Sequence, residues 1–325
     1  MREDKFISQN SEIWKDLEST LTKLKSKSIY SFTKDELDSF LNTYNLTCGH
    51  LSYARTNYGN TNTTIYLNKL VASAHSYIYS NKTFSIKKMV LFLITGFPRL
   101  IMKNSKPVLI AALLFLLGTA VSFLFTLIST DNAGAFISQE MVDGVLSSDI
   151  NEYDNTRNGA ILSPFIFTNN IKVGILAFAL GITLAIGTVW VLYTNGYMLG
   201  ALAGLYFHKG GNLLFWSLIL PHGILELFAI FVCGGAGLII GYSIINPGKY
   251  SRKDSLIIRG KEAIKLVLGT IPIFVIAGLI EGYFTPSPIF SEIVKLIFAL
   301  ITLALLGMYI LIPNLRHQKH NNALQ

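Results

Sequence analysis

The chain has 325 residues, of which 51% are hydrophobic and only 14% are charged, and its net charge is +8. A soluble domain averages about 25% charged residues, so this composition excludes a purely soluble enzyme, a disordered chain and a collagen-like repeat. Two cysteines, Cys48 and Cys233, are too few for a disulfide scaffold. The composition predicts a membrane protein, in which excess positive charge is expected on cytoplasmic loops.

Residues 1–81 are polar and predict a cytoplasmic domain of three amphipathic helices. Apolar residues of the first recur at helical spacing on one face: Phe6, Ile13, Trp14, Leu17, Leu21 and Leu24. The second begins at a capping box of Thr33 and Glu36 and ends before Gly59. Its apolar residues are Leu37, Phe40, Leu41, Tyr44, Leu51 and Tyr53. Those of the third are Ile65, Leu67, Leu70, Val71, Ala74 and Ile78. No apolar core follows the charged first residues, so we expect no secretory signal peptide.

Residues 82–106 combine apolar side chains with basic ones. We expect Phe84–Met102 to lie on the inner leaflet as an interfacial helix whose lysines reach the lipid headgroups, with a further crossing as the alternative. The residues expected at the membrane surface are Lys87, Lys88, Arg99, Lys103 and Lys106.

Residues 107–315 predict an all-α transmembrane bundle of about six spans, some of them broken or re-entrant. Four apolar stretches are each long enough, at 1.5 Å per residue, to cross a hydrocarbon layer of roughly 30 Å. They are Val108–Ile128, Lys172–Tyr193, Ala263–Glu281 and Ile293–Ile312. The apolar tract Gly196–Ile245 is too long for one span and contains Pro221, so we expect two crossings there, at least one broken.

The distribution of charge orients the bundle. Basic residues precede the first span and fill the loop at 246–262, whereas 129–171 is acidic. Its charged residues are Asp131, Glu140, Asp143, Asp149, Glu152 and Asp154 against Arg157. We therefore expect 129–171 to be an extracytoplasmic loop, and both termini, including a tail at 316–325, to be cytoplasmic.

Three ionisable residues, His222, Glu226 and Glu281, fall inside the apolar segments, where a charge costs at least ~2.5–3.5 kcal/mol. His222 and Glu226 are four residues apart, so a helix places them on one face, and Pro221 is expected to put His222 at the start of a broken helix. A structural pairing, an ion or proton pathway, and a metal or catalytic site all stay open. His222 is the one histidine of Leu213–Ile245, and His208 falls in the loop that precedes this segment, so we expect no metal and no other cofactor.

Small and polar residues of the apolar segments add to this candidate intramembrane site. Asn170 and Asn195 flank spans, where they either cap helix ends or line the site. Gly200 with Gly204, and Gly237 with Gly241, form faces of small residues that let helices approach closely. The simpler interpretation of these faces is packing within one chain. The alternative is a homodimer interface, and we predict a homodimer.

Several separated motifs together resemble the stage II sporulation protein M family of integral membrane proteins. They are 168–183, Asn195-Gly196, 221–227, Pro247-Gly248 and 277–282 with 286–288, preceded by 66–71 and 96–99 in the polar part. The resemblance implies a multi-pass protein of a bacterial or archaeal cytoplasmic membrane. It also implies partners in the cell envelope, either peptidoglycan-degrading enzymes or an AAA+ ATPase system.

We therefore predict a non-catalytic protein that scaffolds a cell-envelope complex, with 1–81 and the acidic loop as partner surfaces. A transporter or channel that uses the buried His/Glu site is the first alternative, and an intramembrane metal-dependent hydrolase is the second. The sequence holds no Walker A, Cys-x-x-Cys or Gly-x-Ser-x-Gly motif. Its basic clusters lack the context of a nucleic-acid-binding domain, so we expect no nucleic acid partner.

Overall fold

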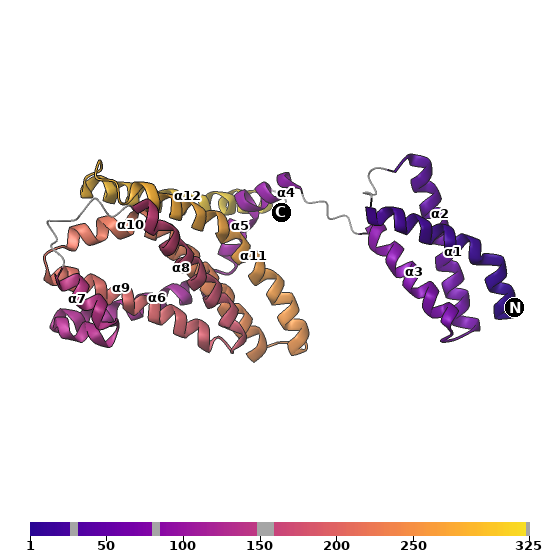
Figure 1. Ribbon diagram of the computed structural model, residues 1–325, viewed down its shortest axis with the longest axis horizontal. Coiled ribbons are helices and arrows are strands. Elements are labelled where there is room, and N and C mark those ends of the chain that lie inside the picture. The colour runs from indigo at the N-terminus through magenta and orange to yellow at the C-terminus, as the bar shows by residue number, and fades with distance from the viewer. Residues whose placement is uncertain (27–31, 80–84, 148–158, 323–325) are drawn as a thin grey trace. The chain divides into compact units, whose positions relative to one another are not determined.

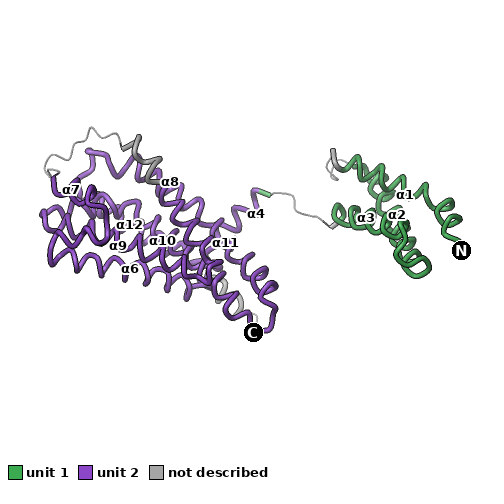
Figure 2. Tube along the Cα trace, turned by 60° about the horizontal axis from the view of Figure 1, so that its bottom comes forward, with its two compact units in different colours: residues 1–85 green, residues 86–325 purple. Residues whose placement is uncertain are grey.

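The computed structural model describes residues 1–26, 32–79, 85–147 and 159–322, and its regular elements in these ranges are all helices (Figure 1). The predicted all-α class is confirmed. The chain divides into two compact units, residues 1–85 and residues 86–325, which are coloured separately in Figure 2.

The first unit is a three-helix domain made of α1 (Glu3–Ser26), α2 (Lys34–Asn57) and α3 (Asn62–Tyr79). The predicted capping box is present, because the Glu36 amide donates to Thr33 Oγ1 at 3.3 Å and the Thr33 amide donates to Glu36 Oε2 at 2.8 Å. Two donors that α2 would otherwise leave unsatisfied are thus paired. The three helices bury one core: Phe6, Trp14, Leu17, Leu21, Leu24, Phe40, Leu51, Ala54, Leu67, Leu70 and Ala74.

Two residues expected in this core are exposed instead. Ile65 is 42% exposed and Tyr53 is 36% exposed. On α3 the buried face follows Leu67, Leu70 and Ala74, at spacings of three and four. Ile65 precedes Leu67 by two residues and so projects from the opposite side of the helix.

The second unit is a bundle around one central helix. Its elements in chain order are α4 (Ile86–Leu91), the π-helix η2 (Phe92–Gly96), α5 (Phe97–Lys103), α6 (Ser105–Ile128), the 3-10 helix η3 (Thr130–Ala135), α7 (Gln139–Ser147), α8 (Gly159–Ala179), the 3-10 helix η4 (Leu180–Ile182), α9 (Ile186–His208), α10 (Asn212–Ile245), α11 (Arg252–Leu279), the π-helix η5 (Ile280–Phe284) and α12 (Glu292–Asn322). The helix α10 contacts α6, α8, α9, α11 and α12. In its most apolar window 67% of α10 is buried, against 11% of α12, so α10 is the core helix and α12 the peripheral one.

Four described helices are long and apolar enough to cross a membrane: 105–128, 212–245, 252–284 and 292–315. By helix length and hydropathy, the described residues therefore contain four candidate spans, and not the expected six or so. The helix α8 contributes only the shorter apolar stretch 168–182. The helix α9 is not among the four, because the polar and small residues with which it packs against α6 lower its hydropathy.

The helix breaks differ from the predicted ones in two segments. Lys172–Tyr193 is not one span, because η4 and two left-handed residues, Leu184 and Ala185 at φ of 56° and 67°, separate α8 from α9. Conversely, Pro221 does not break α10, which runs through it as one helix of 34 residues. His222 thus lies inside a continuous helix rather than at the start of one.

The expected boundaries of the bundle also move. The helix α8 begins at Gly159, inside the predicted outer loop, and α12 continues to Asn322, inside the predicted tail. The loop residues Asp149, Glu152, Asp154 and Arg157 lie outside the described residues. The segment expected at the membrane surface forms α4, η2 and α5, and α5 packs on α11 and α12.

Candidate functional site

Three predicted polar residues converge inside the bundle, each from a different element. Glu226 lies near the middle of α10, Glu281 lies on η5, and Asn170 lies on α8. Asn170 hydrogen-bonds the Glu226 carboxylate, and the carboxylates of Glu226 and Glu281 are close enough to interact electrostatically. The two glutamates are only 6% and 7% exposed. We call Glu226 and Glu281 the carboxylate pair.

The carboxylate pair is incompletely satisfied. Glu226 Oε1 and Glu281 Oε2 are buried and have no hydrogen-bond partner among the described residues. The ion pair formed by the described part of the chain joins Lys103 and Glu262, so no described cation neutralises either glutamate. Burying an ionised carboxylate without a partner costs several kcal/mol, and a second carboxylate nearby adds repulsion. The pair is therefore a place where the bundle favours added positive charge.

A widened helical turn presents Glu281 to the bundle. The Thr285 amide donates to the Ile280 carbonyl at 2.9 Å, five residues back, which is the π-helical pattern. Glu281 and Gly282 are buried, whereas Tyr283 is 75% exposed. The helix η5 contacts α8 and α10, the two elements that carry Asn170 and Glu226. Such π-turns are frequent at functional sites because one inserted residue re-aims a side chain.

His222 contacts the end of the same turn. It is 7% exposed, and its Nδ1 lies 3.2 Å from Thr285 Oγ1, on the residue that caps η5. Thr285 was not singled out from the sequence, although it follows Glu281 by four residues. Across the described residues no three His, Cys, Asp or Glu side chains are grouped for a metal ion. The site does not supply the three protein ligands of a catalytic zinc.

Asn195 lies apart from this cluster. Its side-chain amide donates to the Val191 carbonyl of its own helix, α9, at 2.7 Å. This bond closes within one helical turn. The structure therefore brings together Asn170, Glu226 and Glu281, places His222 next to them through Thr285, and leaves Asn195 outside.

The four predicted packing glycines all face other segments of the same chain. A Cβ atom on Gly200 would lie 2.0 Å from the Thr119 carbonyl oxygen on α6, and one on Gly237 would lie 2.2 Å from the Ala177 carbonyl oxygen on α8. Gly204 and Gly241 are equally constrained, at 2.7 Å and 2.5 Å from neighbouring atoms. These contacts make the glycines packing positions within the chain. The homodimer stays a prediction.

The predicted surface cations are exposed. Lys87, Lys88, Arg99 and Lys106 are open to the outside, and Lys103 is 64% exposed while its Nζ lies 2.8 Å from Glu262 Oε1. Asn104 donates to the same Glu262 oxygen at 2.8 Å. The junction of α5 and α6 is thereby fixed to α11.

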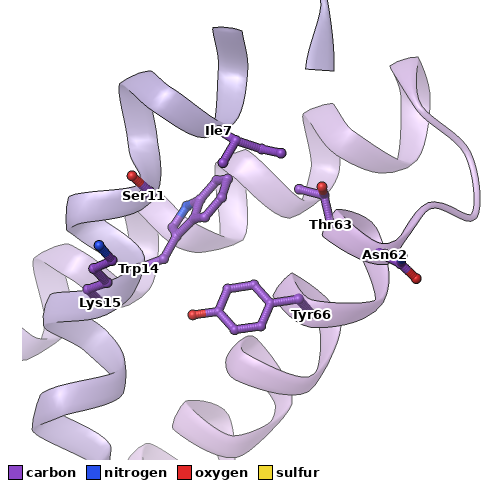
Figure 3. Close-up of a pocket in the computed structure, with 7 residues that line it drawn as sticks. All are labelled: Ile7, Ser11, Trp14, Lys15, Asn62, Thr63 and Tyr66. Atoms are coloured by element: carbon purple, nitrogen blue, oxygen red, sulfur yellow. The ribbon is translucent and has the colours of Figure 1, made fainter. Parts of the chain in front are cut away.

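A pocket in the first unit was not predicted from the sequence. It measures about 330 Å³, and Figure 3 shows Ile7, Trp14, Thr63 and Tyr66 around it, with Lys15 and Asn62 on its outer sides. Apolar and aromatic residues at helical spacing predict a buried core, so the sequence gives no separate indication of the pocket. Its walls come from α1 and from the first turns of α3.

Hydrogen bonds hold both aromatic walls of this pocket. The Trp14 indole N–H donates to His50 Nδ1 at 3.0 Å, and the Tyr66 hydroxyl donates to Glu18 Oε2 at 3.1 Å. Burial lowers the pKa of His50, which keeps Nδ1 free to accept. Burial, and then the Glu18 carboxylate, raises the pKa of Tyr66. The pocket is thus preformed around neutral, oriented rings.

Comparison with known proteins finds a separate match for each of the two compact units. The family model described as Stage II sporulation protein M matches residues 111–286, and a domain of unknown function (DUF8413) matches residues 4–80. The first match contains the carboxylate pair, and the second contains the pocket. No solved structure matches.

Two uncharacterized proteins of Methanocaldococcus jannaschii are similar in sequence. MJ0793 is 32% identical over 183 residues, which cover 56% of this chain and 94% of the relative. MJ0706 is 32% identical over 123 residues, which cover 37% of this chain and 54% of that relative. The chain thus spans about half the length of MJ0706 and nearly all of MJ0793.

Proposed function

Because this chain belongs to the stage II sporulation protein M family of membrane proteins, we propose that it organises a complex in the envelope of a prokaryotic cell. Its membrane bundle is the anchor, and its N-terminal unit is the surface that recruits a partner. The partner is another envelope-associated protein, and the bilayer and a second copy of the chain complete the assembly.

One observation carries this proposal: the N-terminal unit has its own core and an open, preformed pocket. Trp14 and Tyr66 form apolar walls whose polar ends are already hydrogen-bonded. Aromatic walls with a few polar groups at the rim are what a protein partner uses as an anchoring site.

Charge supports a cytoplasmic position for this unit. Exposed cations on 86–106 follow this unit in the sequence and precede α6, and the positive-inside rule assigns such residues to the cytoplasmic side. The proposed membrane is the cytoplasmic membrane of a bacterium or archaeon, with both termini inside.

Site-specific photo-crosslinking tests the proposal in native membranes. A photoreactive amino acid is placed at Ser11 or Asn62, which line the pocket, in the full-length chain. The matched control is Thr56, which is exposed on α2 and does not line the pocket. We expect one discrete adduct with an envelope protein from both pocket positions and none from Thr56.

Binding of that protein, purified, to the full-length chain in lipid nanodiscs completes the test. Ser11→Trp, which fills the pocket without removing a core side chain, should weaken binding at least tenfold, whereas Thr56→Trp should leave it unchanged. Equal crosslinking from Thr56 and the pocket positions, or no loss of binding with Ser11→Trp, would contradict the proposal.

Transport of a small solute or ion is the second candidate function, and the carboxylate pair favours it. Buried, unpaired carboxylates in a membrane bundle mark ion and proton pathways in transporters. Flux through the purified protein in proteoliposomes, lost with Glu226→Gln and retained with Glu140→Gln, would support it. Absence of flux for both protons and monovalent cations would exclude this second function and leave the organising function as the one proposal.

A further inference from the structure

We propose that Glu226 and Glu281 act as one unit that binds a proton inside the membrane bundle and exchanges it with water. The proposal concerns what the carboxylate pair binds, and it holds whether or not the protein moves a solute or recruits a partner.

Two buried oxygens of the pair, Glu226 Oε1 and Glu281 Oε2, have no hydrogen-bond donor among the described residues. An ionised carboxylate only accepts, whereas a protonated one also donates. A proton on one glutamate therefore supplies a donor inside the bundle and removes one of the two negative charges that interact there. One proton thus relieves the electrostatic repulsion between the two carboxylates.

Charged and titratable groups on the surrounding elements do not compensate the pair. On α10, His222 contacts a threonine hydroxyl, and on α8, Lys172 is exposed. On α12, Lys295 has Glu292 as its electrostatic neighbour, and on α11, Glu262 pairs with a lysine. At the end of α9, His208 contacts a backbone carbonyl of α6. None of these described groups is placed to neutralise the pair.

The described residues around the pair suit a proton better than a metal ion. The described residues hold no group of three potential metal ligands among His, Cys, Asp and Glu. Asn170 turns its amide donor toward Glu226, which orients a hydrogen-bonding group rather than an oxygen ligand at the site. A proton needs neither a ligand cage nor a cavity, so it suits a site where η5 contacts α8 and α10.

Infrared spectroscopy of the full-length chain in lipid nanodiscs tests this directly. A protonated carboxylic acid gives a carbonyl band that shifts in D₂O and disappears when the acid ionises. We expect such a band in the wild-type protein at neutral pH, and we expect it to be lost as the pH is raised. Replacing K⁺ by Na⁺ at constant pH and ionic strength should leave it unchanged.

Single variants show whether the two glutamates act as a unit. In Glu226→Gln the remaining acid has lost its like-charged neighbour, so its titration midpoint should fall by at least about 1 pH unit, a tenfold loss of proton affinity. Glu281→Gln should behave likewise. Glu140→Gln, which removes an exposed glutamate of α7, should leave the band and its midpoint unchanged.

Three results would overturn the proposal. The first is a wild-type spectrum with no acid band at neutral pH. The second is a band that Na⁺ abolishes, which would assign the pair to a monovalent cation. The third is a midpoint that neither single variant moves. The wild-type spectra decide the first two without relying on any variant, and none of these readouts requires flux or a partner protein.

Discussion

Replacing Gly200 by alanine should destabilise the bundle by about 2–4 kcal/mol. Its added Cβ would lie 2.0 Å from the Thr119 carbonyl oxygen and 2.3 Å from Ser122 Oγ, whereas ordinary contact begins at 3.4 Å. The helices α6 and α9 must therefore separate by roughly 1 Å. Overpacking of this kind costs about 1–3 kcal/mol. Separation also breaks the 3.0 Å hydrogen bond from Thr119 Oγ1 to the Gly196 carbonyl, for about 1 kcal/mol more.

Reversible unfolding in mixed detergent micelles, followed by circular dichroism, measures this loss. Gly307→Ala is the matched control, because nothing lies within 4 Å of its added Cβ on α12. That control should be neutral or gain about 0.5–1 kcal/mol, since alanine is the better helix former. A Gly200→Ala protein as stable as the wild type, or one altered only in oligomeric state, would refute the packing argument and favour a homodimer interface.

Two further predictions concern side-chain hydrogen bonds. Protonation of His50 removes the acceptor of the Trp14 indole N–H. Burial lowers the pKa of His50 in the folded state, so the folded unit favours the neutral imidazole. The first unit should therefore be fully stable above about pH 6.5 and lose stability as the pH falls below it. Hydrogen exchange of α1 and α2 amides should quicken between pH 7 and pH 5 after correction for intrinsic rates, and His50→Gln should flatten that dependence. Lys209→Met should make the amides of α7 exchange about fivefold faster. The reason is that Lys209 Nζ donates to the carbonyls of Val145 and Leu146 at the end of that helix. Unchanged exchange would mean that apolar contacts alone hold α7.

Local patterns predicted the first unit well. The face of α1 and the Thr33 capping box follow from residue spacing, which local structure alone determines. The membrane bundle was harder to predict. Its interior and its lipid-facing side are both apolar, so hydrophobic periodicity does not show which side of a helix is buried. Tertiary packing then decides where helices break: α10 runs through Pro221, while Leu184 and Ala185, which carry no turn signal, hold the reversal between α8 and α9.

The candidate site was predictable in its members but not in its arrangement. The cost of burying charge singled out Glu226 and Glu281 from the sequence. Their convergence depends on the π-turn at 280–284, and the role of Thr285 depends on its contact with His222. Neither a π-turn nor a contact between α10 and the end of η5 leaves a mark on sequence spacing. Asn195, by contrast, was a reasonable candidate that its own helix satisfies.

The size of the complex released from native membranes shows whether the pocket of the first unit holds a partner protein. Ser11→Trp fills the pocket of the first unit, and Thr56→Trp adds the same bulk at an exposed position on α2. We expect the wild-type and Thr56→Trp proteins to migrate in a complex with an envelope protein, well above the 36.0 kDa chain in its detergent micelle. Ser11→Trp should migrate without that protein while retaining its fold. A wild-type chain that migrates with no other protein, or a Ser11→Trp chain that keeps the complex, would contradict the account.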